Sequence, residues 1–177
     1  MDDVTIRAER TDDYDAIAEV VAAAFGSPAE ARLVEAIRAS SNFVARWSLV
    51  AELRGRVAGH VMVSFVALRD GTAERLIASL SPLAVAPDVQ GEGIGSALVR
   101  AVSARVDEDG EPLIVLEGSP VYYGRFGFEH SVPHGIHVRL PEWAPPEAAQ
   151  ILRLRNYDSS IRGHVVYPPA FDDVSAH

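Results

Sequence analysis

The sequence predicts one mixed α/β domain in which strands and helices alternate along the whole chain. The 177 residues suit a single domain with a sizeable core. Apolar residues make up 48% and charged residues 23%, which disfavours disorder and coiled coil. Apolar residues recur with helical spacing in some segments and form short β-rich runs in others, with no internal repeat or linker between them. We therefore expect one domain over residues 1–177, of a class that some schemes call α+β.

The first half reads as a strand, two helices and a hairpin. Thr11 is the expected N-cap of the first helix, because acidic residues follow it in the first turn. Gly26 is expected to end that helix, and Gly55 lies in the turn of the hairpin. The expected elements are a strand over 4–10, helices over 11–25 and 29–40, and a hairpin over 48–68.

The second half alternates strands with helices. Pro82 interrupts a long β-rich run, and since proline cannot donate to a strand ladder, it predicts an edge or a bulge. The run "LIVLE" is almost wholly apolar, as in a strand buried on both faces. The expected elements are strands over 74–87, 112–118, 135–140, 149–154 and 163–168, with helices over 93–110 and 119–131.

The composition excludes several kinds of function. A formal net charge of −9 argues against nucleic-acid binding through a basic face. All sixteen basic residues are arginine, so neither a Schiff-base lysine nor a P-loop lysine is available. The chain also has no cysteine, which removes disulfides, a thiolate nucleophile and zinc–thiolate sites. The acidic "MDDVTIRAER" does not resemble a signal peptide, and no apolar run is long enough to cross a bilayer. We expect a cytoplasmic protein with no nucleic-acid or membrane partner.

A glycine-rich loop precedes the helix expected over 93–110. The segment reads "VQGEGIGSALVRAV", with glycines at 91, 93 and 95 between a strand and the helix. This order points several backbone N–H groups at one place, where the helix dipole adds positive charge and glycine admits a bulky ligand. The loop is therefore suited to a phosphate or pyrophosphate. Its spacing does not fit G-x-G-x-x-G, and the Walker lysine is missing.

The pattern Gln90-x-x-Gly93-x-Gly95 resembles the pyrophosphate-binding motif of the GNAT superfamily of acyl-CoA-dependent N-acetyltransferases. The segment "VYYGRFGFEH" is similar to the aromatic helix after the fifth strand of that family, with Tyr123 at the tyrosine position before Gly127. Within the superfamily, the chain resembles the YhbS-like branch over roughly residues 4–171.

The resemblance implies a GNAT-like fold with a mixed, mostly antiparallel sheet of about seven strands flanked by helices. In this family strands four and five splay apart, and the pantetheine arm of coenzyme A enters between them like an added strand. Pro82 lies where such a splay would begin. The main chain of Leu83, Ala84 and Val85 is then expected to contact pantetheine, with the Leu83 N–H donating to the oxyanion of the thioester.

The resemblance also assigns acetyl-CoA as co-substrate, with no metal. Main-chain amides, without a cationic side chain, are expected to hold the diphosphate. The Ser96 hydroxyl adds a donor, and Gln90 offers a side-chain amide where many relatives carry arginine. The expected diphosphate-binding residues are Gln90, Gly91, Glu92, Gly93, Ile94, Gly95 and Ser96.

The chemistry implied is direct attack of an amine on the thioester, because a cysteinyl acyl-enzyme is impossible here. Tyr123 is the expected general acid for the leaving thiolate, or at least a hydrogen-bond donor to its sulfur, and is therefore also an expected coenzyme contact, while Tyr122 is expected to pack. Glu117, at the end of the "LIVLE" strand, is the expected base through a water. His60 is a second candidate for the base.

Other polar residues remain open at this point. Many family members carry an asparagine after the fifth strand; here Ser119 stands nearby as a possible coenzyme contact. Ser79 and Ser81 are candidates to line the cleft. His134 and His137 have a spacing that chelates metal on a helix, but the proline and glycine around them predict a turn.

Three functions stay open from the sequence. The first is an N-acetyltransferase acting on a primary amine of a small molecule or peptide. The second is a non-catalytic module that binds or senses acyl-CoA, and the third is a scaffold in which the loop is only a turn. A homodimer is possible, since dimers are common in such folds.

Overall fold

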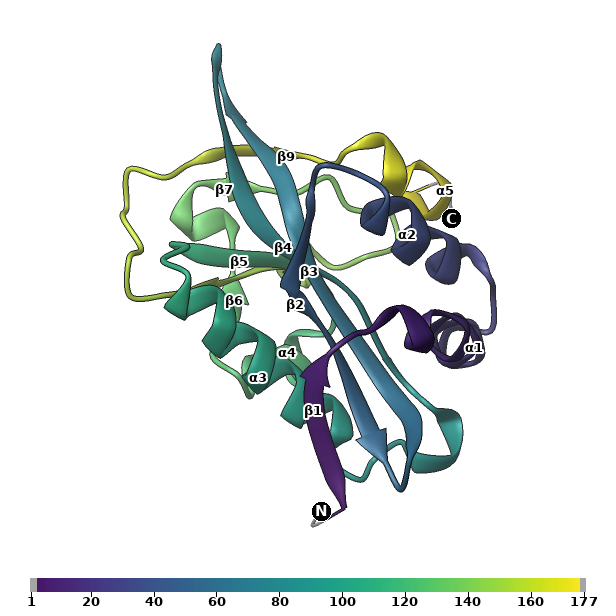
Figure 1. Ribbon diagram of the computed structural model, residues 1–177. Helices are drawn as coiled ribbons and strands as arrows, with labels where there is room; N and C mark the ends of the chain where they lie inside the picture. Colours follow the sequence, from purple (N-terminus) through teal and green to yellow (C-terminus); the bar gives the residue numbers. More distant parts are fainter. Residues whose placement is uncertain (1–2, 176–177) are drawn as a thin grey trace.

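The computed structural model describes residues 3–175, which form a central sheet with helices on both faces (Figure 1). Among these residues the sheet has nine strands, where the sequence predicts about seven. The two shortest have two residues each. The strands are β1 (Val4–Ala8), β2 (Phe43–Leu53), β3 (Arg56–Asp70), β4 (Ala73–Val85), β5 (Leu113–Glu117), β6 (Glu129–His130), β7 (Ile136–His137), β8 (Ala149–Arg153) and β9 (Gly163–Val166).

The sheet is mixed and mostly antiparallel, as predicted. Its main path runs β1-β2-β3-β4-β5-β8-β6, and β9 pairs with both β3 and β7. Only the β4–β5 and β7–β9 pairs are parallel. Two strands pair with the same edge of β3: β2 pairs along most of its length, and β9 pairs near its C-terminal end. The tip of the β3–β4 hairpin projects from the body at the top of Figure 1.

The helices pack on opposite faces of the sheet (Figure 1). α1, α2 and α5 cover one face, and α3 and α4 cover the other. Thr11 is not the N-cap of α1: a short 3-10 turn precedes that helix, and the Asp13 carboxylate accepts the N–H of Arg10 at 2.7 Å. Gly26 does end α1, with φ +66°. None of the helices within 3–175 is long and apolar enough to span a membrane. The bounds are α1 (Tyr14–Phe25), α2 (Ala29–Arg38), α3 (Ile94–Glu108), α4 (Pro120–Gly124) and α5 (Asp172–Ser175).

The core has two layers, one on each side of the sheet. Successive strand residues point to opposite faces, so β5 supplies Val115 to the α1–α2 layer and Leu116 to the α3 layer. All four residues of "LIVL" are buried, which explains why this strand shows no polar alternation. Ile37 from α2 and Leu98 from α3 close the two layers, and both are fully buried.

The pairing between β4 and β5 is short, and this opens the sheet. The two strands pair only at Ala78 with Ile114 and at Ser79 with Val115. The sequence predicts an edge or a bulge at Pro82, and both are present, since the register with β3 shifts by one residue there and β5 no longer pairs with this part of β4. From residue 80 to residue 85, β4 therefore has β3 on one side and a free edge on the other.

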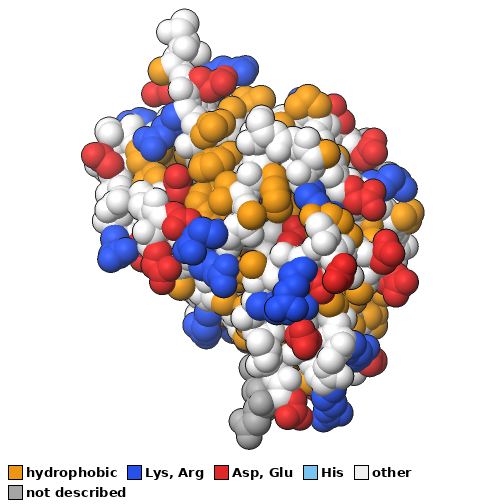
Figure 2. Space-filling view, in the orientation of Figure 1, with side chains coloured by type: hydrophobic (Ala, Val, Ile, Leu, Met, Phe, Trp, Pro, Cys, Tyr) orange, Lys and Arg blue, Asp and Glu red, His pale blue; other side chains and the backbone are white. Residues whose placement is uncertain are grey.

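Charges of both signs are mixed on the face of the molecule shown in Figure 2. Figure 2 shows arginine and acidic side chains interspersed over the face seen in Figure 1. Arg7, for example, contacts Asp13 at 2.7 Å and Glu52 at 3.0 Å. Such pairs neutralise the arginines locally.

Candidate active site

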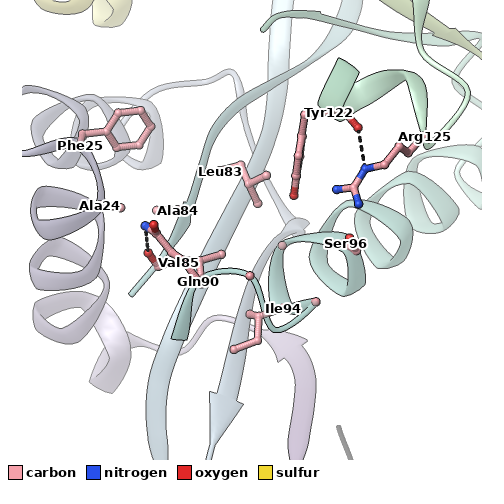
Figure 3. Close-up of a pocket in the computed structure, with 13 residues that line it drawn as sticks. Ala24, Phe25, Leu83, Ala84, Val85, Gln90, Ile94, Ser96, Tyr122 and Arg125 are labelled. Atoms are coloured by element: carbon pink, nitrogen blue, oxygen red, sulfur yellow. Dashed lines mark hydrogen bonds between the residues drawn. The ribbon is translucent and has the colours of Figure 1, made fainter. Parts of the chain in front are cut away.

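The free edge of β4, the start of α3, the end of α1 and α4 enclose a cleft of about 480 Å³ (Figure 3). Nine of the twelve residues that the sequence predicts to bind the coenzyme line this cleft. The lining residues are Ala24, Phe25, Leu83, Ala84, Val85, Gln90, Gly91, Gly93, Ile94, Gly95, Ser96, Tyr122 and Arg125.

The glycine loop leaves the first amides of α3 without partners in the helix. Gly93 is the N-cap of α3, has φ +88°, and carries no side chain that could cap the helix. The first helical hydrogen bond found runs from the Ala97 N–H to the Gly93 carbonyl, at 3.1 Å. The N–H groups of residues 94–96 therefore have no acceptor from the preceding turn. Together with the dipole of this 15-residue helix, they form a site suited to an anion.

Gly95 allows a close approach by Tyr122. A Cβ at position 95 would lie 2.5 Å from the Tyr122 hydroxyl oxygen. The Tyr122 ring also packs edge-on against Tyr123 and Phe126, with centroid distances of 4.9 and 5.5 Å. The sequence predicts that Tyr122 only packs, but Tyr122 forms a wall of the cleft, whereas Tyr123 packs against the core cluster beneath α3.

Arg125 is a cleft residue that the sequence-based interpretation missed. Its Nε donates to the Tyr122 carbonyl at 3.2 Å, and its guanidinium lies 4.7 Å from the Tyr122 ring centroid. Figure 3 shows it beside Ser96 at the start of α3. A cationic side chain is therefore present at the loop, where the sequence predicts main-chain amides alone. The sequence does contain an indication of this role, because Arg125 follows Tyr122 by three residues in "YYGRFGF" and would lie on the same side of a helix.

Among the predicted coenzyme contacts, Glu92 and Ser119 lie outside the cleft lining, and Gln90 lines the cleft with its side chain bound to the main chain. The Gln90 side chain donates to the Val85 carbonyl at 3.0 Å, so its amide is already used within the protein. Glu92 lines a neighbouring hollow of about 280 Å³, which shares Ile94 with the cleft. Ser119 is the N-cap of α4 and accepts the Tyr122 N–H at 3.2 Å.

Tyr123 lies next to the cleft wall, outside the set of lining residues. A Cβ at Gly118 would be 2.6 Å from a carbon of its ring, and the Phe128 ring is 5.7 Å away. Burial raises the pKa of the Tyr123 hydroxyl well above its usual range, and the neighbouring Tyr122 adds to this. The hydroxyl is therefore protonated at neutral pH.

Glu117 ends β5, beyond the last pairing of β5 with β4. It is also outside the set of lining residues. Its Oε1 accepts a hydrogen bond from the Tyr167 hydroxyl at 3.2 Å. Burial raises the pKa of the Glu117 carboxyl, and the hydrogen bond from Tyr167 opposes that rise. Glu117 thus directly precedes Gly118, the residue that the Tyr123 ring approaches closely.

The structure does not bring His60 or Ser79 to the cleft. His60 is fully buried, its Nε2 is 3.0 Å from the Ser48 hydroxyl, and burial lowers its pKa to about 4. Ser79 is 1% exposed, and Ser81 is half-buried without lining the cleft. His60 is therefore not suited to receive a proton from an amine in the cleft.

The late histidines do not converge. His134 Nε2 contacts Glu129 at 2.7 Å, whereas the His137 ring stacks on His164 with centroids 4.8 Å apart. Within 3–175, no group of three histidine or acidic side chains is arranged to hold a metal ion.

Comparison with known proteins identifies the family. The model of the "Acetyltransferase (GNAT) domain" matches residues 5–131. The chain is 30% identical over 158 residues to the uncharacterized N-acetyltransferase YhbS of Escherichia coli, covering 89% of this chain and 90% of YhbS. It is 34% identical over 121 residues to YjhQ of the same organism, another uncharacterized N-acetyltransferase, covering 67% of each chain.

Solved structures agree with the sequence comparison. The crystal structure of E. coli YhbS in complex with CoA matches with a TM-score of 0.85 and 31% identity, over 96% of this chain and 92% of that one. A GNAT acetyltransferase from Brucella melitensis in complex with acetyl-CoA matches with a TM-score of 0.76 and 34% identity, over 96% and 98% of the two chains. This chain belongs to the GNAT family of acetyltransferases.

Proposed function

We propose that this protein transfers the acetyl group of acetyl-CoA to a primary amine of a small molecule or peptide, within a ternary complex. The observation that carries the proposal is one cleft that joins the free edge of β4 to the uncapped start of α3. The CoA and acetyl-CoA complexes of the E. coli and Brucella relatives support the ligand class.

Backbone groups of the cleft bind the coenzyme in this proposal. The main chain of residues 83–85 pairs with the amides of the pantetheine arm, as an added strand pairs with a sheet edge. The amides at the start of α3 hold the diphosphate, and Arg125 contributes the positive charge.

The reaction is a single displacement through a tetrahedral intermediate. The amine nitrogen attacks the thioester carbonyl carbon, the N–C bond forms, and the C–S bond breaks. The Leu83 N–H donates to the carbonyl oxygen as it becomes an oxyanion. Glu117 accepts the proton of the amine through a water, and Tyr123 gives its proton to the leaving thiolate. The raised pKa of Tyr123 keeps the hydroxyl protonated at neutral pH, so it has a proton to donate to the sulfur, at least as a hydrogen bond.

The test is release of free thiol from acetyl-CoA in the presence of a broad amine panel. Tyr123→Phe should lower kcat by about 10²-fold or more with little change in the Kd for CoA. Tyr122→Phe is the matched control, since it removes the adjacent hydroxyl. Glu117→Gln should lower kcat to a similar extent.

Other outcomes decide against the proposal. CoA binding without consumption of any amine would make the protein an acyl-CoA-binding module. A larger loss from Tyr122→Phe than from Tyr123→Phe would move the role of acid to Tyr122.

A further inference from the structure

The hydrogen bond between Tyr167 and Glu117 joins two distant parts of the chain. Tyr167 follows β9 directly, and its partner at the end of β5 lies 50 residues earlier in the sequence. In the sheet, β3 and β4 separate β9 from β5. The contact therefore reaches across one face of the sheet to the strand end beside the splay.

Tyr167 is held in place on the face covered by α1 and α2. It packs against the core cluster of that face, and its ring lies 4.9 Å from that of Phe171, which is 4% exposed. Just beyond, Asp173 in α5 contacts Arg32 of α2 at 3.9 Å. The packing against Phe171 and the core cluster, rather than the exposed ion pair, holds the ring from which the hydroxyl reaches Glu117.

The hydrogen bond has two chemical effects on the carboxyl group. The hydroxyl donates to Oε1 and leaves Oε2 available for a water or an amine. A donor to the ionised form also favours ionisation, which opposes the effect of burial on Glu117. Burial raises the pKa of Tyr167 itself, so the hydroxyl remains a donor at neutral pH.

We propose that Tyr167 is a positioning residue that orients the Glu117 carboxylate and keeps it ionised for proton abstraction from the acceptor amine. This inference rests on the proposed function, in which Glu117 is the general base. Tyr167 itself contacts neither the coenzyme nor the reacting atoms in this proposal.

The experiment compares Tyr167→Phe with the wild type and with Tyr157→Phe. Tyr157 is a matched control, because it is also a half-buried tyrosine but packs beside His134 and Arg153. Carbon-13 NMR of the glutamate carboxyl groups, with Glu117→Gln for assignment, follows the Glu117 titration in the free protein. The rate of thiol release from acetyl-CoA is measured against pH with propylamine, tyramine and alanine amide as acceptors.

Tyr167→Phe should raise the pKa of Glu117, because it removes the donor that lowers it. A base acts when it is deprotonated, so kcat/KM rises with pH through this pKa, and the rise should move to higher pH in the variant. At pH 7 kcat should fall about tenfold while KM for acetyl-CoA stays constant. Tyr157→Phe should leave the titration and the pH profile unchanged.

Several results would overturn the inference. The inference would be wrong if Tyr167→Phe left the pKa of Glu117 unchanged, even if Glu117→Gln were inactive. It would also be wrong if Tyr167→Phe raised this pKa but left the pH dependence of kcat/KM unchanged. An equal further loss from Tyr167→Phe in the Glu117→Gln background would show a purely structural role. Failure of the proposed function is distinct: the wild type would bind CoA but release thiol with no amine of the broad panel, which would remove the catalytic role of both residues.

Discussion

The close approach of Gly95 and Tyr122 predicts a strong coupling between substitutions at the two positions. In Gly95→Ala the new Cβ would lie 2.5 Å from the tyrosine oxygen, whereas ordinary contact begins near 3.4 Å. The ring must therefore move by about 1 Å. Because Tyr123, Phe126 and Arg125 surround it, such overpacking should cost about 1–2 kcal/mol.

The same substitution should be harmless once the oxygen is removed. In Tyr122→Phe, the nearest atoms to the new Cβ are Val85 Cγ2 at 3.6 Å and the ring carbon Cζ at 3.8 Å, both ordinary contacts. Alanine also favours the helix over glycine by up to about 1 kcal/mol. Gly95→Ala should thus destabilise the wild type and stabilise Tyr122→Phe slightly, with a coupling energy of about 1.5 kcal/mol.

Urea unfolding of the four proteins, followed by circular dichroism, measures this cycle. Comparable m-values would show that the free energies of unfolding can be compared directly. If Gly95→Ala changed stability by the same amount in both backgrounds, the inferred contact between Gly95 and Tyr122 would be wrong.

Three further predictions concern charge, pH and packing. Arg125→Gln should weaken CoA binding about tenfold and reduce its salt dependence in calorimetric titrations, whereas Arg69→Gln, at an exposed position of the β3–β4 hairpin, should do neither. The pKa of His60 is about 4 in the folded protein against 6.5 for the free side chain, so between these values the unfolded state binds more protons. The contribution of neutral His60 to the free energy of unfolding should therefore be complete above pH 6.5, and up to about 3 kcal/mol of it should be lost towards pH 4 in urea unfolding. If a His60→Gln variant lost the same free energy over this pH range, His60 would not be the cause. Leu98→Ala, at a fully buried position of α3, should lower the free energy of unfolding by about 2–5 kcal/mol, and a change below 1 kcal/mol would contradict the packing described.

The fold followed from the sequence wherever a periodic pattern was long enough. α2 was predicted because Leu33 and Ile37 lie one turn apart on one face, and both are buried. An edge or a bulge at Pro82 was predicted from its missing N–H group. By contrast β6 and β7 have two residues each, too short to show an alternation, and tertiary pairing alone defines them.

The candidate site was predictable where backbone geometry decides it. A strand, three glycines and a helix start have few alternative arrangements, so most of the loop residues indeed line one cleft. α4 differs, because a five-residue helix has no stripe to fix which side faces inward. Successive residues of a helix point about 100° apart, so only one of Tyr122 and Tyr123 can face the cleft, and without a stripe the sequence does not show that it is Tyr122, with Arg125 beside it.

The opening between β4 and β5 should lower the local stability of the free edge of β4. Amides of residues 80–85 that face away from β3 lack a neighbouring strand, so they should exchange hydrogen faster than their counterparts deep in the sheet. A coenzyme bound along the free edge of β4 would slow this exchange. At a free coenzyme concentration one hundred times its Kd, binding would also stabilise the folded state by about 2.7 kcal/mol. The thermal resistance of the protein would then follow the coenzyme concentration around it.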